Sequence, residues 1–412
     1  MAEFSDIKND DGQTLLVKNF EKSRFVNENS VLAKYLNPKT VNPEEKVIKS
    51  LIFPFGCNRS QFKAVDIALN NQLSIIQGPP GTGKTQTILN IIANLLMNNK
   101  TVLIVSNNND ATANVYEKLS SEKYGLGFIC ATLGKRKNTE DFLQNQKQFY
   151  PSYLKEWDNK LSGISIFLDD EIKKLERYFE ANERISIINT QLDSLKTEIN
   201  YFSSTPHDIY YNKKLLKQKS DVLMELLQKI QFIYTEKEKL GFFTKLILKL
   251  KYGIGTYKFW KTEPEKVIDT IKTIYYPLIQ KELETELSEN HSIADSFYPS
   301  SIYNECLVRL KSKIANKYSK KTERTKFEDG KDIYFHPSAF ANEYPVILST
   351  TFSSRGTIGP DGDFLFDYVI MDEASQVDIV TGALALSCAK NAVIVGDKMQ
   401  LPNVIEENKK KT

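Results

Sequence analysis

The feature that most constrains the fold of this chain is a phosphate-binding loop that begins at Gly78. Residues 78–85 read Gly-Pro-Pro-Gly-Thr-Gly-Lys-Thr and match the pattern G-x-x-x-x-G-K-[ST] in full. An apolar run at 73–76 precedes the loop, and a helical apolar pattern at 85–97 follows it. In this context the backbone N–H groups of the loop and the N-terminus of the helix bind phosphate oxygens. The pattern therefore predicts a nucleotide-binding α/β domain.

Individual residues of this loop have separate predicted roles. The glycines let the backbone wrap around phosphate oxygens. We predict that Lys84 holds the β- and γ-phosphates of ATP and takes part in catalysis, and that the hydroxyl of Thr85 binds Mg²⁺. The alternative interpretation is a glycine-rich turn without a ligand. The predicted ATP-binding residues of the loop are Gly78, Pro79, Pro80, Gly81, Thr82, Gly83, Lys84 and Thr85.

Two adjacent carboxylates, Asp372 and Glu373, follow another apolar run at 368–371. We predict that Asp372 supports the Mg²⁺ shell and that Glu373 is the general base that polarises the attacking water. An Asp-Glu pair after a strand is common by itself. It is informative here because the same chain carries a phosphate-binding loop.

A third candidate is Gln400, which lies in the string Val-Gly-Asp-Lys-Met-Gln-Leu-Pro at 395–402. This string follows the apolar run at 392–395. Open α/β sheets bind ligands at the carboxyl ends of their strands, so a glutamine placed there can reach the γ-phosphate. We therefore predict a catalytic role for Gln400. Without the other two motifs, a plain Gly-Asp turn would be the preferred interpretation.

Apolar runs of four or five residues recur in two parts of the sequence and predict buried parallel strands. They lie at 73–76, 101–105, 345–349, 368–371 and 392–395. A helix of small residues is expected at 382–389. The predicted fold class is α/β: one parallel sheet flanked by helices, interrupted by a long helical, coiled-coil-like insertion. The predicted divisions are an N-terminal arm or accessory segment at 1–50, the first part of the α/β domain at 51–139, the insertion at 140–340 and the second part of the domain at 341–412.

Within the insertion, apolar residues recur at alternating steps of three and four, as in coiled-coil seams. One seam contains Ile185, Ile188, Leu192, Leu195, Ile199 and Phe202, and the other contains Leu223, Leu226, Ile230 and Ile233. The break at 203–206, Ser-Ser-Thr-Pro, predicts that these two seams form an antiparallel hairpin. We expect a stalk that could bind a protein partner; the alternative is an ordinary helical subdomain packed on the core.

The composition favours a globular protein in the cytoplasm. The 412 residues are 41% hydrophobic and 26% charged, which excludes a wholly disordered or collagen-like chain. No stretch reaches the roughly 18 apolar residues of a membrane span, and the first ten residues do not resemble a signal peptide, so no membrane partner is expected. The four cysteines and three histidines are too widely spaced to indicate a zinc site or a disulfide framework.

The net charge of +3 is close to balanced, so a nucleic-acid footprint would have to be local. One local candidate is a basic stretch between residues 309 and 326. It consists of Arg309, Lys311, Lys313, Lys317, Lys320, Lys321, Arg324 and Lys326, opposed only by Glu323. Such a stretch either contacts phosphates or forms a solvated helix face.

Taken together, the loop at 78–85, the string Asp-Glu-Ala-Ser-Gln at 372–376 and the string at 396–402 resemble motifs I, II and III of superfamily 1 helicases. They are most similar to the group that contains the nonsense-mediated-decay helicase and its bacterial relatives. The resemblance covers about residues 50–135 and 340–405. It implies a RecA-like P-loop NTPase of the AAA-domain type that uses ATP and Mg²⁺ and acts on single-stranded DNA or RNA.

Further segments are similar to other motifs of this family. Residues 58–61 resemble the Q motif, in which Gln61 would read the adenine edge. Residues 106–110 resemble motif Ia and residues 348–353 resemble motif Ic, both of which face nucleic acid in the family. The resemblance therefore implies nucleic-acid contacts by Ser106, Asn107, Asn108, Asn109, Ser349, Thr350 and Thr351. The alternatives are a surface helix residue, an ordinary loop and a strand end that satisfies its own backbone.

The sequence departs from the family pattern by stopping just past motif III. Family members continue into a second RecA-like domain whose arginines reach the γ-phosphate. We therefore expect this chain alone to bind ATP and Mg²⁺ but to hydrolyse ATP slowly. Two functional hypotheses remain open: the first motor domain of a helicase, and a nucleotide-dependent switch or scaffold whose helical stalk binds a protein partner.

Overall fold

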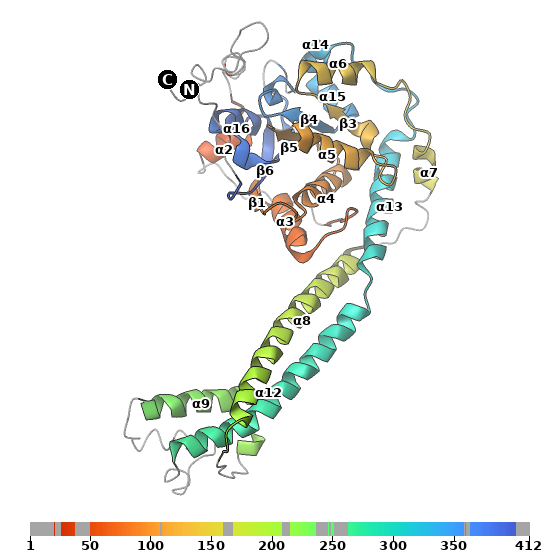
Figure 1. Cartoon of the computed structure of the whole chain (residues 1–412). Helices are drawn as coiled ribbons and strands as arrows, with labels where there is room; N and C mark the ends of the chain where they lie inside the picture. The colour runs from red at the N-terminus through yellow and green to blue at the C-terminus, as the bar shows by residue number, and fades with distance from the viewer. Residues whose placement is uncertain are drawn as a thin grey trace, which may run out of the picture. The chain divides into compact units, whose positions relative to one another are not determined.

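The computed structural model describes residues 20, 26–37, 50–107, 109–159, 168–207, 215–235, 246, 249–250, 263–357, 359 and 363–400. They form two compact units, each described separately below. The first contains the described residues up to Leu175 and from Tyr298 onward, and the second runs from Glu176 to Phe297 (Figure 1). The second unit is shorter than the predicted insertion because residues on both sides of it pack with the first unit.

The first unit is built on a six-stranded parallel sheet with the strand order β1-β6-β5-β2-β4-β3. The strands are β1 (Leu73–Gln77), β2 (Val102–Ser106), β3 (Cys130–Thr132), β4 (Val346–Thr350), β5 (Phe366–Met371) and β6 (Ala389–Gly396). Because all neighbours are parallel, every strand ends at the same edge of the sheet, which we call the carboxyl edge. The predicted α/β class is confirmed.

Helices cover both faces of this sheet. They are α2 (Val31–Leu36), α3 (Arg59–Asn70), α4 (Lys84–Met97), α5 (Asn109–Ser120), α6 (Arg136–Gln144), α7 (Leu154–Asn159), α13 (Pro299–Tyr318), α14 (Gly330–Phe335), α15 (Pro337–Glu343) and α16 (Ile379–Leu386). One core cluster joins α2, α14, α15 and α16 to one face through Leu103 and Val105 of β2. Helices α3, α4 and α5 lie on the other face, where α13 packs against α4. The result is a three-layer α/β unit.

Two local predictions need correction. The small-residue helix expected at 382–389 is α16, which begins earlier because the Asp378 carboxylate caps it by accepting from the backbone N–H groups of Val380 and Thr381 at 3.0 Å. The end of the predicted range is wrong, because α16 ends at Leu386 and Ala389 is the first residue of β6. Strand β3 was missed, because three residues are too short to produce a recognisable apolar run. In addition, Val31 of the predicted N-terminal arm is buried in the main core.

Helix α4, which follows the phosphate-binding loop, is buried on all sides. Its apolar residues pack as predicted, and two asparagines on the same helix are also fully buried. The Asn94 amide accepts from the backbone N–H of Ile52 and donates to its carbonyl, both at 2.8 Å. The Asn90 amide likewise accepts from Phe55 and donates to Gly56. These bonds fix the segment 52–56 beside the N-terminal half of α4.

The second unit consists of α8 (Leu168–Ser203, from Glu176 on), α9 (Ser220–Thr235) and α12 (Pro264–Asp295). The predicted pairing of the two seams is wrong. The α8 seam packs against Tyr276 and Leu283 of α12, and the α9 seam packs against Val267 and Ile271 of the same helix. The side chain of Ile233 lies outside the described residues. Helix α12 has 32 residues, twice the 16 of α9, and is long enough to cover both seams.

Ion pairing and ring contacts give the direction of this packing. The Arg184 guanidinium binds the Glu286 carboxylate through two hydrogen bonds of 2.5 and 2.8 Å. Further along α8, the Phe202 ring contacts the Tyr276 ring at 5.5 Å between centroids. As the numbers rise on α8 they fall on α12, so the two helices are antiparallel. In the part of the chain that the structure describes, we find no helix with the length and apolarity to cross a membrane.

Candidate nucleotide site

The phosphate-binding loop connects the end of β1 to the start of α4. The backbone N–H of Gly78 donates to the Gly396 carbonyl at 3.2 Å, which ties the loop to the end of β6. Within the loop, the Lys84 ammonium donates to the Gly78 carbonyl at 2.9 Å, and the Thr82 hydroxyl donates to the Pro79 carbonyl at 2.7 Å. The loop is therefore closed on itself, with the Lys84 ammonium held across it.

Gly83 is the residue whose lack of a side chain the loop requires. It is the N-cap of α4 and has φ +83°, in the left-handed region. A Cβ atom there would lie 2.0 Å from the Gln61 amide nitrogen. The Gln61 side chain is buried, and its amide nitrogen contacts the carbonyls of Thr82 and Gly83 at 3.2 and 3.3 Å. The pattern's second glycine is thus needed for both backbone conformation and space.

Asp372 and Glu373 come directly after β5, the second neighbour of β1 in the sheet. Asp372 is 5% exposed, and its carboxylate accepts from the Glu373 backbone N–H at 2.9 Å. Burial raises the pKa of Asp372, with a further increase from the Glu373 charge, while that N–H bond and Lys84 act in the opposite direction. A buried, repelled carboxylate of this kind is stabilised by a nearby cation.

Glu373 has two unusual features. Its φ is +51°, in the left-handed region that residues with side chains rarely adopt. Its Oε2 atom is buried, and no described residue hydrogen-bonds to it. Backbone strain and a polar atom without a partner both cost free energy, and such features cluster at functional sites.

A cavity of about 660 Å³ brings the predicted residues together. It is lined by Phe55, Pro80, Gly81, Gly83, Lys84, Thr85, Gln86, Leu89, Lys118, Tyr124, Glu373 and Gln400. Since β1, β6 and β5 are neighbours, the segments that follow them converge at one part of the carboxyl edge. The Gln400 amide oxygen is buried there without a hydrogen-bond partner among the described residues. Asp372 is next to this cavity rather than in its lining, as are Gly78, Pro79 and Thr82.

The residues of this site fit ATP and Mg²⁺. Oxygen ligands are what Mg²⁺ prefers, and the Thr85 hydroxyl and the Asp372 carboxylate supply them. Among the described residues, Asp372 makes no ion pair with a lysine or arginine that would satisfy its charge. Bound there, the metal would neutralise phosphate charge.

The cavity is also lined by Phe55, Lys118 and Tyr124, which were not among the predicted site residues. The Phe55 and Tyr124 rings are in contact, with centroids 4.2 Å apart. Helix α5 and the turn after it bring Lys118 and Tyr124 to the cavity. Neither residue belongs to a motif with recognisable spacing, so no sequence signal identified them.

Gln61 lies beside the loop rather than in the cavity lining. Its amide oxygen accepts from the Asn58 backbone N–H at 2.8 Å, and its backbone N–H donates to the Asn58 side chain, which forms a capping box at the start of α3. Its amide nitrogen also contacts Gln86 at 3.1 Å. In this structure Gln61 positions the loop, and its predicted contact with adenine stays a prediction.

The predicted nucleic-acid residues lie at the carboxyl ends of β2 and β4, which are neighbours in the sheet. The side chains of Ser106, Ser349 and Thr351 are buried, whereas Asn107 and Thr350 are partly exposed. Asn108 and the side chain of Asn109 lie outside the described residues.

Asn107 connects three segments. Its amide nitrogen donates to the Gln376 carbonyl at 2.9 Å, and its amide oxygen accepts a short hydrogen bond from the Thr351 hydroxyl. A hydrogen-bonded chain thus links the loop after β4, the loop after β2 and the segment that carries Asp372 and Glu373.

The basic stretch is not one uniform solvated face. Arg324 is buried in an ion pair, and the Lys311 ammonium lies 4.8 Å from the centroid of the Trp157 ring. Burial lowers the pKa of Lys317, with neighbouring lysines adding to the effect.

A parallel sheet with a closed phosphate-binding loop, an adjacent carboxylate pair and an unpartnered glutamine around one cavity defines a P-loop NTPase domain. A family profile described as an AAA domain matches residues 56–408, and the chain belongs to this family. The predicted relationship to superfamily 1 helicases of the nonsense-mediated-decay group is confirmed.

Three curated relatives show the range of similarity. An uncharacterized ATP-dependent helicase of Mycoplasma genitalium is 25% identical over 82% of this chain and 39% of its own length. A DNA polymerase alpha-associated DNA helicase of Schizosaccharomyces pombe is 29% identical over 43% of this chain and 26% of its own length. A regulator of nonsense transcripts 1 homolog of Drosophila melanogaster is 39% identical over 22% of this chain and 8% of its own length. The chain therefore spans at most about two fifths of these relatives.

Proposed function

We propose that this chain is the ATP-binding first motor domain of a helicase, and that it couples ATP hydrolysis to movement on, or unwinding of, nucleic acid. The observation that carries the proposal is the convergence of Lys84, Thr85, Glu373 and Gln400 on one cavity at the carboxyl edge. The relatives named as ATP-dependent, DNA and nonsense-transcript helicases or regulators support it.

In the proposed reaction, each residue acts on a defined part of the nucleotide. The Lys84 ammonium leaves the Gly78 carbonyl and binds the β- and γ-phosphate oxygens. The Glu373 carboxylate accepts a proton from the attacking water, since Glu373 lines the same cavity and its Oε2 has no partner among the described residues. The Gln400 amide N–H donates a hydrogen bond to a γ-phosphate oxygen, so this bond forms only when the γ-phosphate is bound.

The chain through Asn107 supports coupling between ATP and a single strand. A strand bound at the ends of β2 and β4 would shift the loop that holds Thr351. The hydrogen bonds of Asn107 would pass this shift to Gln376, three residues after Glu373. Such a contiguous network with a buried end is a physical route for coupling.

ATP turnover by residues 1–412 alone is proposed to be slow. No arginine is among the described residues that line the cavity. In related phosphoryl-transfer enzymes an arginine at the γ-phosphate raises the rate by about 10³–10⁵-fold. The expected behaviour is ATP binding with slow hydrolysis.

The test is the rate of ATP hydrolysis with Mg²⁺, measured with and without single-stranded DNA and RNA, on this chain and on its longest natural form. The proposal expects a strand to stimulate turnover, most strongly in the longer form. Turnover that no strand changes, in either form, would contradict the helicase proposal.

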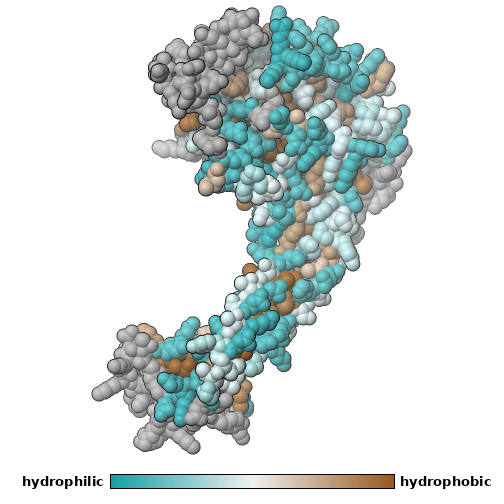
Figure 2. Space-filling model, viewed as in Figure 1, coloured by the Kyte–Doolittle hydropathy of each residue, from teal (hydrophilic) through white to brown (hydrophobic). Residues whose placement is uncertain are grey.

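The second candidate function is a nucleotide-dependent switch whose helical unit binds a protein. A groove of about 520 Å³ between α8, α9 and α12 favours it, and the side chain of Ile187, which lines the groove, is 44% exposed. Figure 2 shows apolar side chains at the surface of this unit among hydrophilic ones. Strand-independent turnover together with a protein captured by the helical unit would favour the switch.

A further inference from the structure

Helix α13 is the helix with which the chain re-enters the first unit. The second unit ends at Phe297, and α13 begins at Pro299. It packs against α4, the helix that follows the phosphate-binding loop. Among the described residues that line the nucleotide cavity, none lies on α13. The contacts of α13 with the segment before α3 nevertheless lead to the nucleotide site.

Tyr303, on the second turn of α13, holds this segment. Its hydroxyl donates to the Cys57 carbonyl at 2.8 Å. Gly56 is buried between the Tyr303 ring and the Gln86 side chain of α4. A Cβ atom on Gly56 would lie 3.4 Å from the ring and 3.3 Å from the Gln86 amide nitrogen. Tyr303, Gly56 and Gln86 are therefore packed closely against one another.

From this segment a chain of hydrogen bonds runs to the phosphate-binding loop. The Gln86 amide donates to the Phe55 carbonyl at 2.7 Å and accepts from the Gln61 amide at 3.1 Å. The Gln61 amide nitrogen in turn contacts two carbonyls of the loop. Phe55 and Gln86 also line the nucleotide cavity. A displacement of Tyr303 would therefore change both the cavity wall and the support of the loop.

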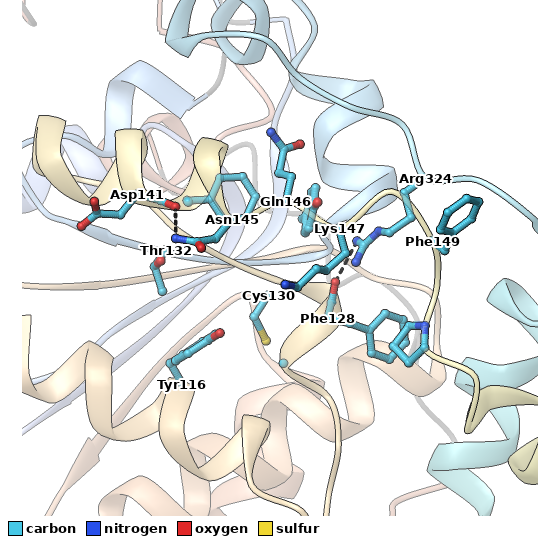
Figure 3. Close-up of a pocket in the computed structure, with 14 residues that line it drawn as sticks. Tyr116, Phe128, Cys130, Thr132, Asp141, Asn145, Gln146, Lys147, Phe149 and Arg324 are labelled. Carbon is cyan, nitrogen blue, oxygen red and sulfur yellow. Dashed lines mark hydrogen bonds between the residues drawn. The ribbon is translucent and has the colours of Figure 1, made fainter.

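The other end of α13 is anchored. Tyr318, its last residue, is fully buried, and its hydroxyl donates to a backbone carbonyl of α15 at 3.2 Å. Beyond it, the Arg324 side chain is 3% exposed, pairs with Glu343 at 2.7 Å and donates to the Phe128 carbonyl at 2.8 Å (Figure 3). Because these bonds fix the C-terminal end of α13, a shift of the helix is expressed mainly at its N-terminal end, where Tyr303 lies.

We infer that Tyr303 is a positioning residue for the nucleotide: its contacts with Gly56 and Cys57 make the affinity for ATP depend on the position of α13. A contiguous chain of packed and hydrogen-bonded groups is the physical form that such coupling takes. This inference rests on the proposed function, because ATP is the ligand whose affinity would change. Tyr303 lies outside all the helicase motifs described above.

The first test measures the ATP affinity of the whole chain by calorimetric titration with Mg²⁺. Tyr303→Phe removes only the hydroxyl, so the segment 55–57 is held less firmly before ATP binds. We expect an affinity about 2- to 5-fold below wild type, as the loss of one hydrogen bond allows. The matched control is Tyr298→Phe, which alters a 73% exposed tyrosine at the start of the same helix and should bind ATP as wild type does.

The second test measures amide hydrogen exchange in α13 with and without ATP and Mg²⁺. Because coupling between two sites is reciprocal, bound ATP should slow exchange in the N-terminal half of α13. The Tyr303→Phe chain, saturated with ATP, should lose most of this slowing. Helix α6, which contributes no residue to the nucleotide cavity, is the internal control and should exchange at the same rate in all samples.

The outcomes separate this inference from the proposed function. If the wild-type chain binds ATP and Tyr303→Phe binds it as tightly as Tyr298→Phe, Tyr303 is only a structural residue; the inference is overturned and the helicase proposal stands. The same holds if exchange in α13 of the wild-type chain does not respond to ATP. If the wild-type chain binds no ATP, both fail.

Discussion

The two halves of the carboxyl edge differ in how their polar groups are satisfied. At the ends of β1, β5 and β6, Glu373 and Gln400 each bury an oxygen that no described residue hydrogen-bonds, and Glu373 also has a strained backbone. At the ends of β2 and β4, Asn107 bonds to the Thr351 hydroxyl and to the Gln376 carbonyl, and the Ser349 hydroxyl is buried without a partner among the described residues. The first half thus leaves a carboxylate oxygen and an amide oxygen unpaired, whereas the second leaves one hydroxyl unpaired and ties its two loops together through Asn107.

This difference separates two kinds of motif residue. A buried polar atom without a partner costs roughly 1–3 kcal/mol, so its retention indicates a ligand. A polar side chain that is already hydrogen-bonded contributes to position and transmission instead. We therefore propose direct chemistry for Glu373 and Gln400, and positioning for Asn107 and Thr351. Lys84 is proposed to exchange its bond to the Gly78 carbonyl for bonds to phosphate.

The largest expected effect is that of Lys84→Ala. Removing the ammonium should weaken ATP binding by at least about 100-fold and abolish turnover, because charge-assisted bonds to phosphate are lost. The melting temperature should change little, since the side chain is only partly buried and bonds to one carbonyl. Calorimetric titration with ATP and Mg²⁺ measures the affinity, and an unchanged value would refute the assignment of the loop.

The second largest expected effect is that of Glu373→Gln on ATP turnover. We expect ATP affinity within about twofold of wild type and turnover lower by about 10²–10⁴-fold, because the amide cannot accept the proton of water. Single-turnover hydrolysis with radiolabelled ATP gives the rate. Persistent hydrolysis would mean that another residue is the base.

Thr351→Val tests the half of the carboxyl edge at the ends of β2 and β4. It removes the hydroxyl but keeps the shape, and the partly exposed Asn107 loses its Thr351 hydrogen bond, at a cost of about 0.5–1.5 kcal/mol in unfolding free energy. We expect strand stimulation of ATP turnover to fall several-fold more than basal turnover. The control is Thr357→Val, a buried threonine whose hydroxyl bonds locally to the Ser354 carbonyl. Equal losses in both variants would make Asn107 and Thr351 purely structural.

The smallest expected effect is on the pH dependence of the stability of the second, helical unit. The His207 ring nitrogens face the Phe202 carbonyl at 2.5 Å and the Asp269 carboxylate at 2.8 Å, so both must carry protons. The Phe202 carbonyl first, and Asp269 second, raise the pKa of His207 above its ordinary value of 6.5, against burial and the nearby Lys272. Since the folded pKa is the higher one, this stabilisation is complete below pH 6.5 and is lost as pH rises through the folded pKa.

Chemical denaturation followed by circular dichroism between pH 5.5 and 8.5 measures this dependence. His207→Gln should flatten it in that window. His291→Gln, at an exposed position on α12, should leave it as in wild type. A wild-type stability that rises with pH across the window would contradict the assignment.

The phosphate-binding loop, Asp372, Glu373 and Gln400 could be predicted because each follows a buried strand at a fixed spacing, and spacing is visible in a sequence. The contributions of Phe55, Lys118 and Tyr124 could not, because tertiary packing alone brings them to the cavity. The seam pairing was wrong for a related reason. Periodicity shows that a helix has an apolar face, but not which other helix covers it.

The linkage between ATP binding and strand binding tests the motor-domain function most directly. We would measure strand affinity of the Glu373→Gln chain with and without ATP and Mg²⁺, and ATP affinity with and without the strand. Because coupling between two sites is reciprocal, a motor domain should show both affinities changing by the same factor, of about 5-fold or more. Two affinities that do not respond to the other ligand would show that the nucleotide half and the strand half of the carboxyl edge are independent, and would contradict the motor-domain function.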